Sequence, residues 1–480
     1  MITQANYIEY NTPQFRRLSD TQLERLHHAS LEILDRTGVI LYDQEALDLM
    51  KRAGVKPDEE NRVHIPPGLV EWALSVVPKR VVLCDRSGRR VMPLERNNVF
   101  FGPGSDCSWV VDHRTGEHRK GSLDFVREGT RVCDALSNID FVMSMCMAHE
   151  IEDQRLVDRL QMRAMLMNTT KPIIHVPIEL DGCIADVEMA EAVAGGEEAL
   201  RRNPNSLCYI NVAHPLRHNA ESLQRLLYMA GKGLPSIYCC VVMAGASGPV
   251  TLAGGLALAN AGELVGVVLS QLKRQGAPIV ISGGYNNTFG MRSNGSGGGE
   301  SPTLRGARPE MAHYYKLPAF GLGGASSSRV PDEQAMAEAS LTLLTEAMSG
   351  NNIIHDVGYL GAGNCYSLEQ LVMCDEMINW VRRFMQGIEI NEETLALDLI
   401  DSVGPHGQYL DAEHTLRHYR EHWYPKLLDQ RRFEDWTPGS PTFRQRARQR
   451  IDQISTSHHP EPLPAHAQSR LDEIVARPIA

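Results

Sequence analysis

Short apolar runs alternate with longer helical patterns from residue 98 onward. The eight runs are 98–104, 139–145, 171–177, 207–215, 235–245, 278–284, 317–324 and 352–358. Between them, segments such as 122–136 and 332–350 place apolar residues at helical spacing. Continuous apolar strands that are each returned by a helix are typical of a parallel sheet. Eight such units favour an α/β fold of the closed (β/α)8 TIM-barrel type over an open sheet.

The chain on either side of these units predicts two extensions. Helical patterns over 18–38, 43–54 and 66–78 precede an apolar strand at 80–86; Ser19 or Asp20 would cap the first helix, and Gly38 would end it. Past residue 390 the pattern is again helical, with a Pro-rich linker near the end. We expect an N-terminal α/β extension over 1–95, a barrel domain over 96–390 and a C-terminal helical tail over 391–480. The segment from Thr437 on would reach over another subunit or lie loosely on the surface.

Small and polar residues end most of the apolar runs. They are Gly102, Gly104, Ser144, His175, Asn211, His214, Gly245, Gly283, Gly284, Gly323, His355 and Asp356. Because the carboxyl ends of barrel strands converge on one mouth, we expect these residues to line a site there. For each residue alone, capping a helix or satisfying buried backbone groups remains an equal alternative.

Aromatic and charged residues gather in the loops near the same predicted mouth. The loop after the first strand carries Asp106 and Trp109, and Tyr359 follows the eighth strand. A glycine-rich segment, 282–302, carries Tyr285, Phe289, Arg292 and Glu300, and it does not match a phosphate-binding loop motif. Ring faces combined with carboxylates are the groups that bind a quaternary ammonium ion. The alternative is that the rings only pack beneath loops.

The composition of the chain limits the classes of partner that it is expected to bind. The formal net charge of −11 and the pI near 5.9 argue against nucleic acid or an anionic membrane as the main partner. The ten cysteines include no C-x-x-C pair, so we expect reduced thiols and a cytoplasmic protein. The apolar segment 251–272 carries Asn260 and Glu263, which favours a buried helix over a membrane span.

Three histidines in the tail, His414, His418 and His422, are spaced four apart, so a helix would place them on one face. That spacing can bind zinc, but no glutamate stands where a metalloprotease motif needs one. A packing or interface helix is the favoured interpretation, and we predict no metal site.

Several long segments resemble the trimethylamine methyltransferase family, the corrinoid-dependent amine methyltransferases. They include FGPGSD (101–106), YYKLPAFGLGGASSSRVPDEQ (314–334), YSLEQLVMCDEM (366–377) and HTLRHYREHWYPKLLDQRRFEDW (414–436). The likeness runs from about Leu18 to about Trp436. It implies a barrel enzyme that moves a methyl group from an amine onto the cobalt of a corrinoid held by a separate small protein.

The resemblance also bears on cofactor and substrate. The chain has no D-x-H-x-x-G element to hold cobalamin itself, so cobalamin would arrive on a partner that docks at the mouth and can use the C-terminal helices. Archaeal members that demethylate trimethylamine carry pyrrolysine, which is absent here. This points to the branch similar to glycine betaine methyltransferase. Carnitine, proline betaine and trimethylamine stay open as substrates, as does a non-catalytic betaine-binding barrel.

On this basis each candidate receives an expected role. The catalytic set is His355, Asp356 and Glu300, with His355 orienting the substrate or touching the corrinoid. The substrate-binding set is Asp106, Trp109, Tyr285, Phe289, Arg292 and Tyr359. Arg292 or the N–H groups of the glycine loop would grip a betaine carboxylate. The cofactor-contacting set is Gly283, Gly284, Gly323 and His214. A homo-oligomer is a further expectation.

Overall fold

A closed barrel of parallel strands forms the centre of the molecule. The computed structural model describes residues 14–282, 285–287 and 300–478. The barrel strands are β5 (Phe100–Phe101), the extended segment 139–145, β8 (Ile173–His175), β9 (Ser206–Val212), β11 (Ser236–Cys240), β13 (Ile279–Val280), β15 (Phe320–Leu322) and β16 (Ile353–His355). Each corresponds to one predicted run, which confirms the predicted fold.

Backbone pairing closes the ring. β8, β9, β11 and β13 form one parallel sheet, and β15, β16 and β5 form another. A bridge between Ile281 and Ala319 joins the two sheets on one side. On the other side, Asp140 N–H donates to the Phe101 carbonyl at 2.7 Å, and Val142 is bridged to Ile173. All eight segments are therefore neighbours in sequence order.

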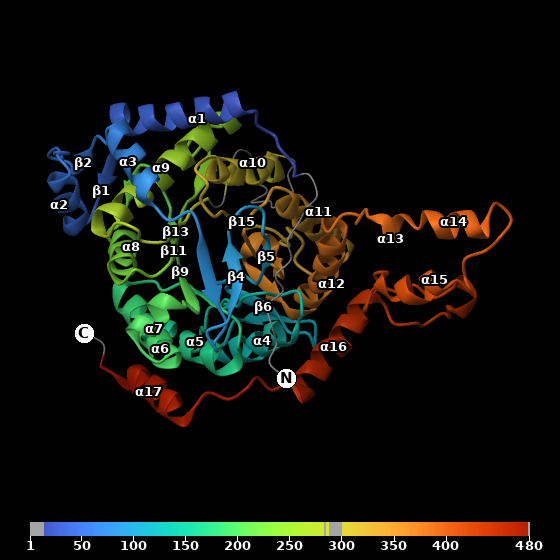
Figure 1. The fold of residues 1–480 in the computed structure, drawn as a ribbon. Coiled ribbons are helices and arrows are strands. Elements are labelled where there is room, and N and C mark those ends of the chain that lie inside the picture. Colours follow the sequence, from blue (N-terminus) through green and yellow to red (C-terminus); the bar gives the residue numbers. More distant parts are fainter. Residues whose placement is uncertain (1–13, 283–284, 288–299, 479–480) are drawn as a thin grey trace.

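A helix follows every barrel segment and covers its outer face (Figure 1). In order these helices are α4 (Leu123–Ala135), α5 (Val157–Asn168), α6 (Leu180–Ala194), α8 (Ala220–Lys232), α9 (Leu252–Lys273), α10 (Glu300–Tyr314), α11 (Glu333–Met348) and α12 (Leu368–Met385), with the short α7 (Glu197–Arg202) after α6. Ser122 caps α4, Asp332 caps α11 and Ser367 caps α12, each through a side-chain oxygen that accepts a backbone N–H.

The barrel is filled by a layer to which every segment contributes. The buried side chains in it are Phe100, Phe141, Ile174, Leu207, Ile237, Val280, Phe320 and Ile353. Val81, Leu83, Met92 and Leu94 of the antiparallel hairpin β3 (Val81–Cys84) and β4 (Arg90–Leu94) join the same cluster. The hairpin lies across the centre of the ring in Figure 1. Because it packs against the inward residues nearest the starts of the strands, it closes the amino-terminal end of the barrel, and the site must lie at the other end.

The N-terminal extension packs on the outside of α9. Its elements are α1 (Asp20–Glu32), a π-helical turn over Ile33–Thr37, β1 (Val39–Leu41), α2 (Gln44–Arg52), β2 (Arg62–Val63) and α3 (Pro67–Val76). Ser19 and Asp43 cap α1 and α2, so the predicted start of the first helix is confirmed. α9 is long and apolar enough to cross a membrane, yet 83% of its most apolar window is buried in the protein. The prediction of a buried helix is therefore confirmed.

Several short strands lie in the loops at the carboxyl ends of the barrel strands. β6 (Trp109–Val111), β7 (His118–Lys120), β17 (Tyr359–Leu360) and β18 (Cys365–Ser367) form one sheet, β12 (Val242–Ala244) pairs with β14 (Tyr285–Asn287), and β10 (Arg217–His218) pairs with β1. The first sheet ties the loop after β5 to the chain after β16, because β18 pairs in parallel with β6. This linkage fixes two loops of the mouth relative to each other.

The C-terminal tail has two parts with different packing. The elements α13 (Glu392–Leu395), α14 (Leu397–Val403) and α15 (Glu413–His418) project away from the barrel (Figure 1). α16 (Phe443–Ser457) then returns onto α12 and α4, and α17 (Ala465–Ala476) packs on α5 and α6. Ile451 and Leu471 are fully buried. The expectation of a tail lying loosely on the surface is therefore wrong for residues 443–476.

Candidate active site at the barrel mouth

The alternation of side chains along the strands determines which residues face the barrel interior above its apolar layer. Side chains two positions apart lie on the same face of a strand. Two positions beyond Leu207, Ile237, Val280 and Ile353 come Tyr209, Cys239, Ser282 and His355, so these four face inward one level nearer the mouth. His355 is therefore delivered to the interior by an apolar strand, as the sequence predicts.

Three rings meet inside the barrel at this level. The ring centroids of His355 and Phe320 lie 4.2 Å apart, in an edge-to-face arrangement. The Tyr209 ring lies 4.9 Å from Phe320 and 5.7 Å from His355. β9 is the fourth segment of the ring and β16 the eighth, so these contacts span the barrel interior. Edge-to-face packing holds the three rings in fixed orientations.

Two carboxylates stand beside these rings, and both have left-handed backbones. Asp106 has φ 64° and Asp356 has φ 76°. Asx residues tolerate this region better than other non-glycine residues, and such conformations concentrate at functional sites. Oδ1 of Asp356 lies 2.7 Å from Nδ1 of His355, at an angle that does not make a hydrogen bond. The turn after each strand thus sets the direction of an acidic side chain.

Burial raises the pKa of the Asp106 carboxyl to about 6, against the lowering effects of a hydrogen bond from Ser105 and of the charges of Arg225 and His355. Asp106 is nevertheless among the exposed residues, and so is Asn211 in the interior of strand β9. Protein atoms surround the Asp106 carboxyl, yet solvent reaches both Asp106 and Asn211. These two side chains and the half-buried Tyr209 therefore mark where solvent meets the interior at the carboxyl end of the barrel.

Two buried polar atoms at this end of the barrel have no hydrogen-bond partner among the described residues. They are Oγ of Ser282 and Nδ1 of His355. Buried polar groups are nearly always satisfied in a folded protein. Nδ1 of His355 is already in contact with the Asp356 carboxylate, so the position of Ser282 Oγ is the one that suits a bound ligand or water.

Tyr359 lies beneath the site and does not line it with a free ring face. It is buried, its hydroxyl donates to the Ser105 carbonyl, and its ring fills the space above Gly104. A Cβ at Gly104 would come within 2.3 Å of that ring. Burial raises the pKa of the Tyr359 hydroxyl well above its usual value, so the group stays neutral. Tyr359 thereby fixes the turn that carries Asp106.

The structure gives three other candidates local structural roles. Trp109 is exposed, and its ring is covered by Lys120, whose Nζ lies 4.1 Å from the ring centroid. Nδ1 of His214 accepts the backbone N–H of Leu216 at 3.2 Å and so stabilises a turn. Gly323 packs against β16, where a Cβ would come within 2.8 Å of Ile354. These contacts give Trp109, His214 and Gly323 structural roles, and the contact of His214 and Gly323 with a corrinoid stays a prediction.

The remaining candidates belong to the glycine-rich segment. Gly283, Gly284, Phe289 and Arg292 lie outside the described residues. Tyr285 opens β14 and Glu300 opens α10. Because β14 pairs with β12 beyond the end of β11, this segment belongs to the carboxyl-end side of the barrel.

Sequence reasoning missed Tyr209 and placed one histidine wrongly. Tyr209 stands between two apolar residues of its strand, and only the register with Leu207 shows that it faces inward. His175 ends β8 but points to the opposite face from Ile174, and its Nδ1 lies 2.9 Å from Oδ2 of the buried Asp186 in α6. The expectation that His175 lines the mouth is therefore wrong.

The tail histidines do not share one helical face as predicted. α15 ends at His418, and His422 follows a separate 3-10 turn. His414, His418 and Glu393 do bring one ligand atom each within 4.8 Å of the others. Arg417 pairs with the same Glu393 carboxylate at 2.8 Å, so these groups already form a charge network. The prediction that His422 belongs to the set is wrong.

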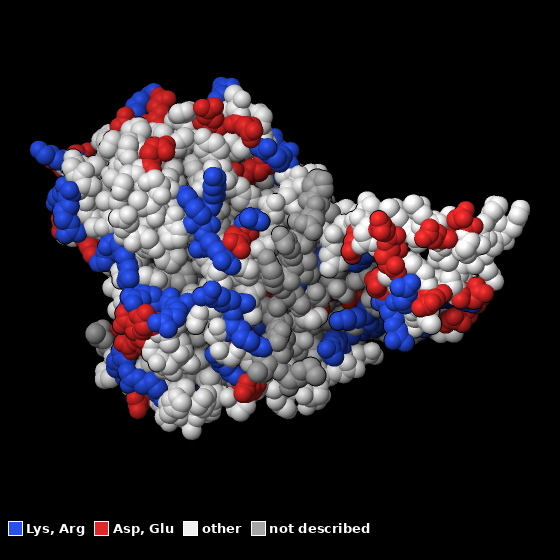
Figure 2. All heavy atoms as spheres, in the orientation of Figure 1, with Lys and Arg blue, Asp and Glu red and all other residues white. Residues whose placement is uncertain are grey.

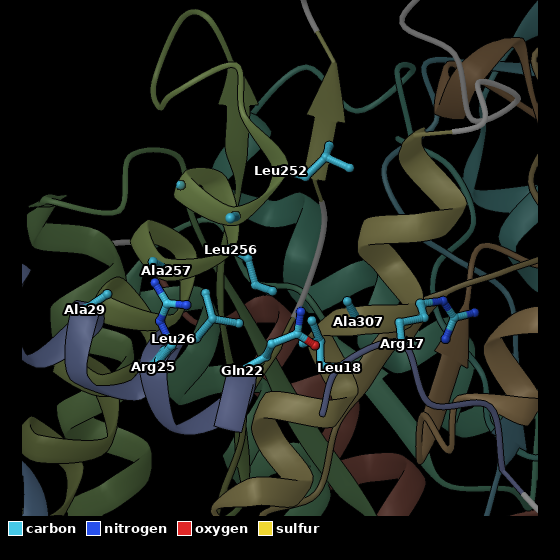
Figure 3. Close-up of a pocket in the computed structure, with 12 residues that line it drawn as sticks. Arg17, Leu18, Gln22, Arg25, Leu26, Ala29, Leu252, Leu256, Ala257 and Ala307 are labelled. Carbon is cyan, nitrogen blue, oxygen red and sulfur yellow. The ribbon is translucent and has the colours of Figure 1, made fainter. Parts of the chain in front are cut away.

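A hollow also lies outside the barrel, between α1, α9 and α10 (Figure 3). It has a volume of about 620 Å³ and is lined mainly by apolar side chains, including Leu18, Leu26 and Leu256. The charged residues in its lining are Arg17 and Arg25. A hollow with this lining lacks the carboxylates that a cationic substrate needs, so it does not compete with the barrel mouth as the site for such a ligand.

The family model and the similar proteins that follow all indicate the same family. Residues 1–480 match the family described as trimethylamine methyltransferase (MTTB). The chain is similar to the trimethylamine methyltransferase MttB of Desulfitobacterium hafniense strain DSM 10664 / DCB-2, with 33% identity over 95% of this chain and 92% of that protein. It is 29% identical to the glycine betaine methyltransferase of Desulfitobacterium hafniense strain Y51, over 97% of each.

A solved structure supports the fold. The monomethylamine methyltransferase MtmB of Methanosarcina barkeri superposes with a TM-score of 0.56 and 13% identity, covering 97% of this chain and 88% of that one. At this identity the likeness bears on the barrel architecture alone. The match of the family to the full length is the decisive observation. The chain therefore belongs to the trimethylamine methyltransferase family.

Proposed function

We propose that this enzyme transfers a methyl group from a quaternary amine to the corrinoid of a separate small protein, and that glycine betaine is its substrate. The observation that carries the proposal is the meeting of Tyr209, Phe320 and His355 beside Asp106 and Asp356 at the carboxyl end of the barrel, where Asp106 is exposed to solvent. Family membership supports methyl transfer, and the site supports a cationic substrate.

The site suits a quaternary ammonium ion for a physical reason. Such an ion has no N–H to donate, so it is recognised through ring faces and negative charge. The Tyr209 and Phe320 rings are fixed by their mutual contact, and the carboxylates of Asp106 and Asp356 supply charge in a partly enclosed space. Rings that are already ordered lose little conformational entropy when the ligand binds.

The reaction requires alignment more than proton transfer. The carbon–nitrogen bond of one methyl group breaks with its electron pair on nitrogen, which leaves a neutral tertiary amine and needs no acid. A reduced corrinoid carried by the partner would supply the electron pair for the new bond to the methyl carbon. This chain would hold the cation so that one methyl points out of the mouth, and such positioning is a large part of the rate enhancement in displacement reactions.

His355 and Asp356 would set the depth and direction of the substrate. His355 is held edge-on to Phe320, and its Nδ1 is next to the Asp356 carboxylate. Positive charge disperses in the transition state, so the carboxylates must not bind the ground-state cation much more tightly. Two carboxylates at the edge of the rings would bind the ground-state cation less tightly than one carboxylate in direct contact with it.

Glycine betaine is favoured over other amines by the polar groups at the carboxyl end of the barrel. Asn211 is exposed there, and Ser282 Oγ has no hydrogen-bond partner within the described part of the chain, so both can donate hydrogen bonds to a substrate carboxylate. Arg292 and the glycine-loop N–H groups remain candidates for the same task. Carnitine or proline betaine would use the same cation site with a larger acid part. Trimethylamine has no carboxylate, so the hydrogen-bond donors of Asn211 and Ser282 would find no acceptor on it.

The other parts of the proposal concern the setting. The corrinoid protein would dock over the carboxyl end of the barrel, because the hairpin β3–β4 closes the opposite end. We propose a cytoplasmic enzyme whose chain divides into an extension over 1–95, a catalytic barrel over 96–390 and a tail over 391–480. Its thiols fit this setting, because all ten cysteines are buried and free.

A spectroscopic assay tests the function. The purified protein is mixed with chemically reduced cobalamin and, in turn, glycine betaine, carnitine, proline betaine and trimethylamine, and methylcobalamin formation is followed by absorbance. We expect turnover with glycine betaine above the others. Turnover with another amine only would change the substrate. Binding of glycine betaine by calorimetry without methylcobalamin formation, even with a corrinoid protein present, would favour a non-catalytic binder.

A further inference from the structure

The projecting segment of the C-terminal tail has no core of its own. We call residues 388–436 the arm. None of the residues from 386 to 446, all of which belong to the described part of the chain, is buried. The helices of the arm have only 4, 7 and 6 residues. Helices this short are not stable in water by themselves, because ordering each residue costs about 1–2 kcal/mol of conformational entropy. The arm therefore needs packing that a single copy does not supply.

The arm and its base carry most of the exposed apolar surface. Of the 23 large apolar residues that are exposed among the described residues, fourteen lie between Trp380 and Trp436. The most exposed are Ile388 at 89%, Phe433 at 86% and Leu410 at 83%. In Figure 2 the arm shows wide uncharged stretches between groups of carboxylates. Apolar surface of this extent marks an interface and not a solvated loop.

The base of the arm is anchored, so the arm has a fixed direction. The Trp380 ring of α12 stacks on the Trp423 ring with centroids 5.8 Å apart. The Glu376 carboxylate accepts the backbone N–H groups of Lys426 at 2.6 Å and Leu427 at 2.9 Å. Both limbs of the arm thus start from the surface of α12. A fixed, apolar projection is suited to a permanent contact.

The arm leaves the barrel at the end opposite to the active site. Barrel helices run antiparallel to the strands, so the carboxyl end of α12 lies at the amino-terminal end of the barrel. The buried ion pair between Arg382, near the end of α12, and Asp140, at the start of the second segment, agrees with this position. The corrinoid partner must reach the other end. The position of the arm therefore argues against docking of the corrinoid protein on the C-terminal helices of the arm, which we had expected.

The charges of the arm complement those of a second arm. The outgoing limb, 391–413, carries six carboxylates and no lysine or arginine. The return limb, 414–436, carries Arg417, Arg420, Lys426, Arg431 and Arg432. The return limb also carries four carboxylates, and Arg417 and Arg431 already pair with Glu393 and Asp429 within one arm. In a two-fold arrangement the acidic outgoing limb of one copy can meet the remaining cations of the other, Arg420, Lys426 and Arg432.

From these observations we propose that the arm is the interface with a second copy of this chain. A partner that binds and leaves in each turnover would expose the arm between cycles, whereas a second copy is always present at the same concentration. Obligate dimer interfaces are apolar and commonly bury about 2,000–5,000 Å². The exposed residues Trp380, Phe384 and Ile388, spaced along one face of α12 and just beyond its end, extend the apolar surface of the arm onto the barrel.

Sedimentation velocity of the full chain tests the proposal. We expect the wild type to sediment as a dimer or a multiple of it at micromolar concentration, and the double variant Leu410→Asp, Phe433→Asp to sediment as a monomer. The matched control is Leu341→Asp, which changes a 57% exposed leucine of α11 outside the arm. The control should sediment like the wild type.

A second measurement covers the case in which the double variant fails to fold. All native cysteines are buried, so Ile400→Cys introduces one reactive surface thiol. A bismaleimide should join two copies of this variant, whereas Leu341→Cys should give none. A monomeric wild type, an unchanged assembly in a folded double variant, or cross-linking equal to the control would each overturn the proposal. Amide protection of the arm that appears only when the corrinoid protein is added would also overturn it.

Discussion

The rings of Tyr209 and His355 lie 5.7 Å apart although their strands stand on opposite sides of the barrel. Each reaches the interior because it lies two residues beyond a member of the apolar layer, Leu207 and Ile353 respectively. The contact narrows the space above that layer and places two rings at the carboxyl end of the barrel, where Asp106 is exposed.

Replacing Tyr209 tests the role of its ring. Tyr209→Ala should weaken glycine betaine binding about 2- to 30-fold, because a ring–cation contact contributes about 0.5–2 kcal/mol. Tyr209→Phe keeps the ring and should bind like the wild type. Calorimetric titration of the three proteins checks this. Equal affinities in all three would mean that the ring does not contact the cation.

The raised pKa of Asp106 predicts a pH dependence of binding. The cation binds more tightly to the ionised carboxylate than to the protonated one. The dissociation constant of glycine betaine should therefore rise as the pH falls through about 6. Asp106→Asn should bind weakly and without this pH dependence. Titrations between pH 5 and 8 measure both. A wild-type affinity that does not change across this range would remove Asp106 from the site.

His355→Ala should lower the rate of methyl transfer about 100-fold, because a loss of alignment near the reacting atoms has effects of this size. The thermal unfolding midpoint should change much less, since the ring lies at the edge of the apolar layer, where it contacts Phe320 and Tyr209, and not at its centre. His355→Gln, which keeps a polar group, is the matched variant and should recover part of kcat. Unchanged turnover in His355→Ala would exclude the histidine from the reaction.

Asp158 predicts a pH-dependent stability that is separate from catalysis. Burial, aided by the nearby Asp186, raises the pKa of its carboxyl to about 7 from 3.8. A carboxyl pKa near 7 in the folded state and 3.8 in the unfolded chain means that the unfolded chain releases its proton first, so the fold loses stability as the pH rises from about 4 to about 7 and loses no more above 7. Asp158→Asn cannot ionise, so its stability relative to the wild type should rise across this window by up to about 1.4 kcal/mol per pH unit. Urea unfolding of both proteins at pH 4, 5.5 and 7.5 measures this, and a difference in stability that does not grow between pH 4 and 7.5 would contradict the prediction.

The buried ion pair between Glu263 of α9 and Arg308 of α10 holds two barrel helices together. Glu263→Gln should lower the free energy of unfolding by about 3–5 kcal/mol, because it removes the carboxylate charge that faces the buried guanidinium of Arg308. The control Glu60→Gln removes an exposed partner of Arg62 and should cost under about 1 kcal/mol. Similar losses in both variants would mean that the buried pair has no special role.

The barrel could be predicted because its strands are buried on both faces and so appear as continuous apolar runs. Helix starts such as Ser19 and Asp43 were also predictable, since a cap acts on its own first turn. The role of hairpin β3–β4 was not, because its contact with the barrel interior joins residues far apart in the sequence. Local patterns carry no information on such pairings.

The active site could be predicted only in part, because some of its contacts join residues that are far apart in the sequence. Asp106, His355 and Asp356 follow strand ends, where topology alone brings them together. Tyr209 and His175 depended on which face of a strand points inward, and a one-residue shift reverses that assignment. Trp109 and His214 were placed at the mouth by position, yet their side chains find local partners in Lys120 and Leu216.

The most direct test of the central claim is a crystal structure of the protein with bound glycine betaine. We predict the trimethylammonium group at the carboxyl end of the barrel, with its nitrogen within about 6 Å of the Tyr209 or Phe320 ring centroid and beside Asp106. Density for the ligand in the hollow between α1 and α9, with none at the carboxyl end of the barrel, would contradict the account.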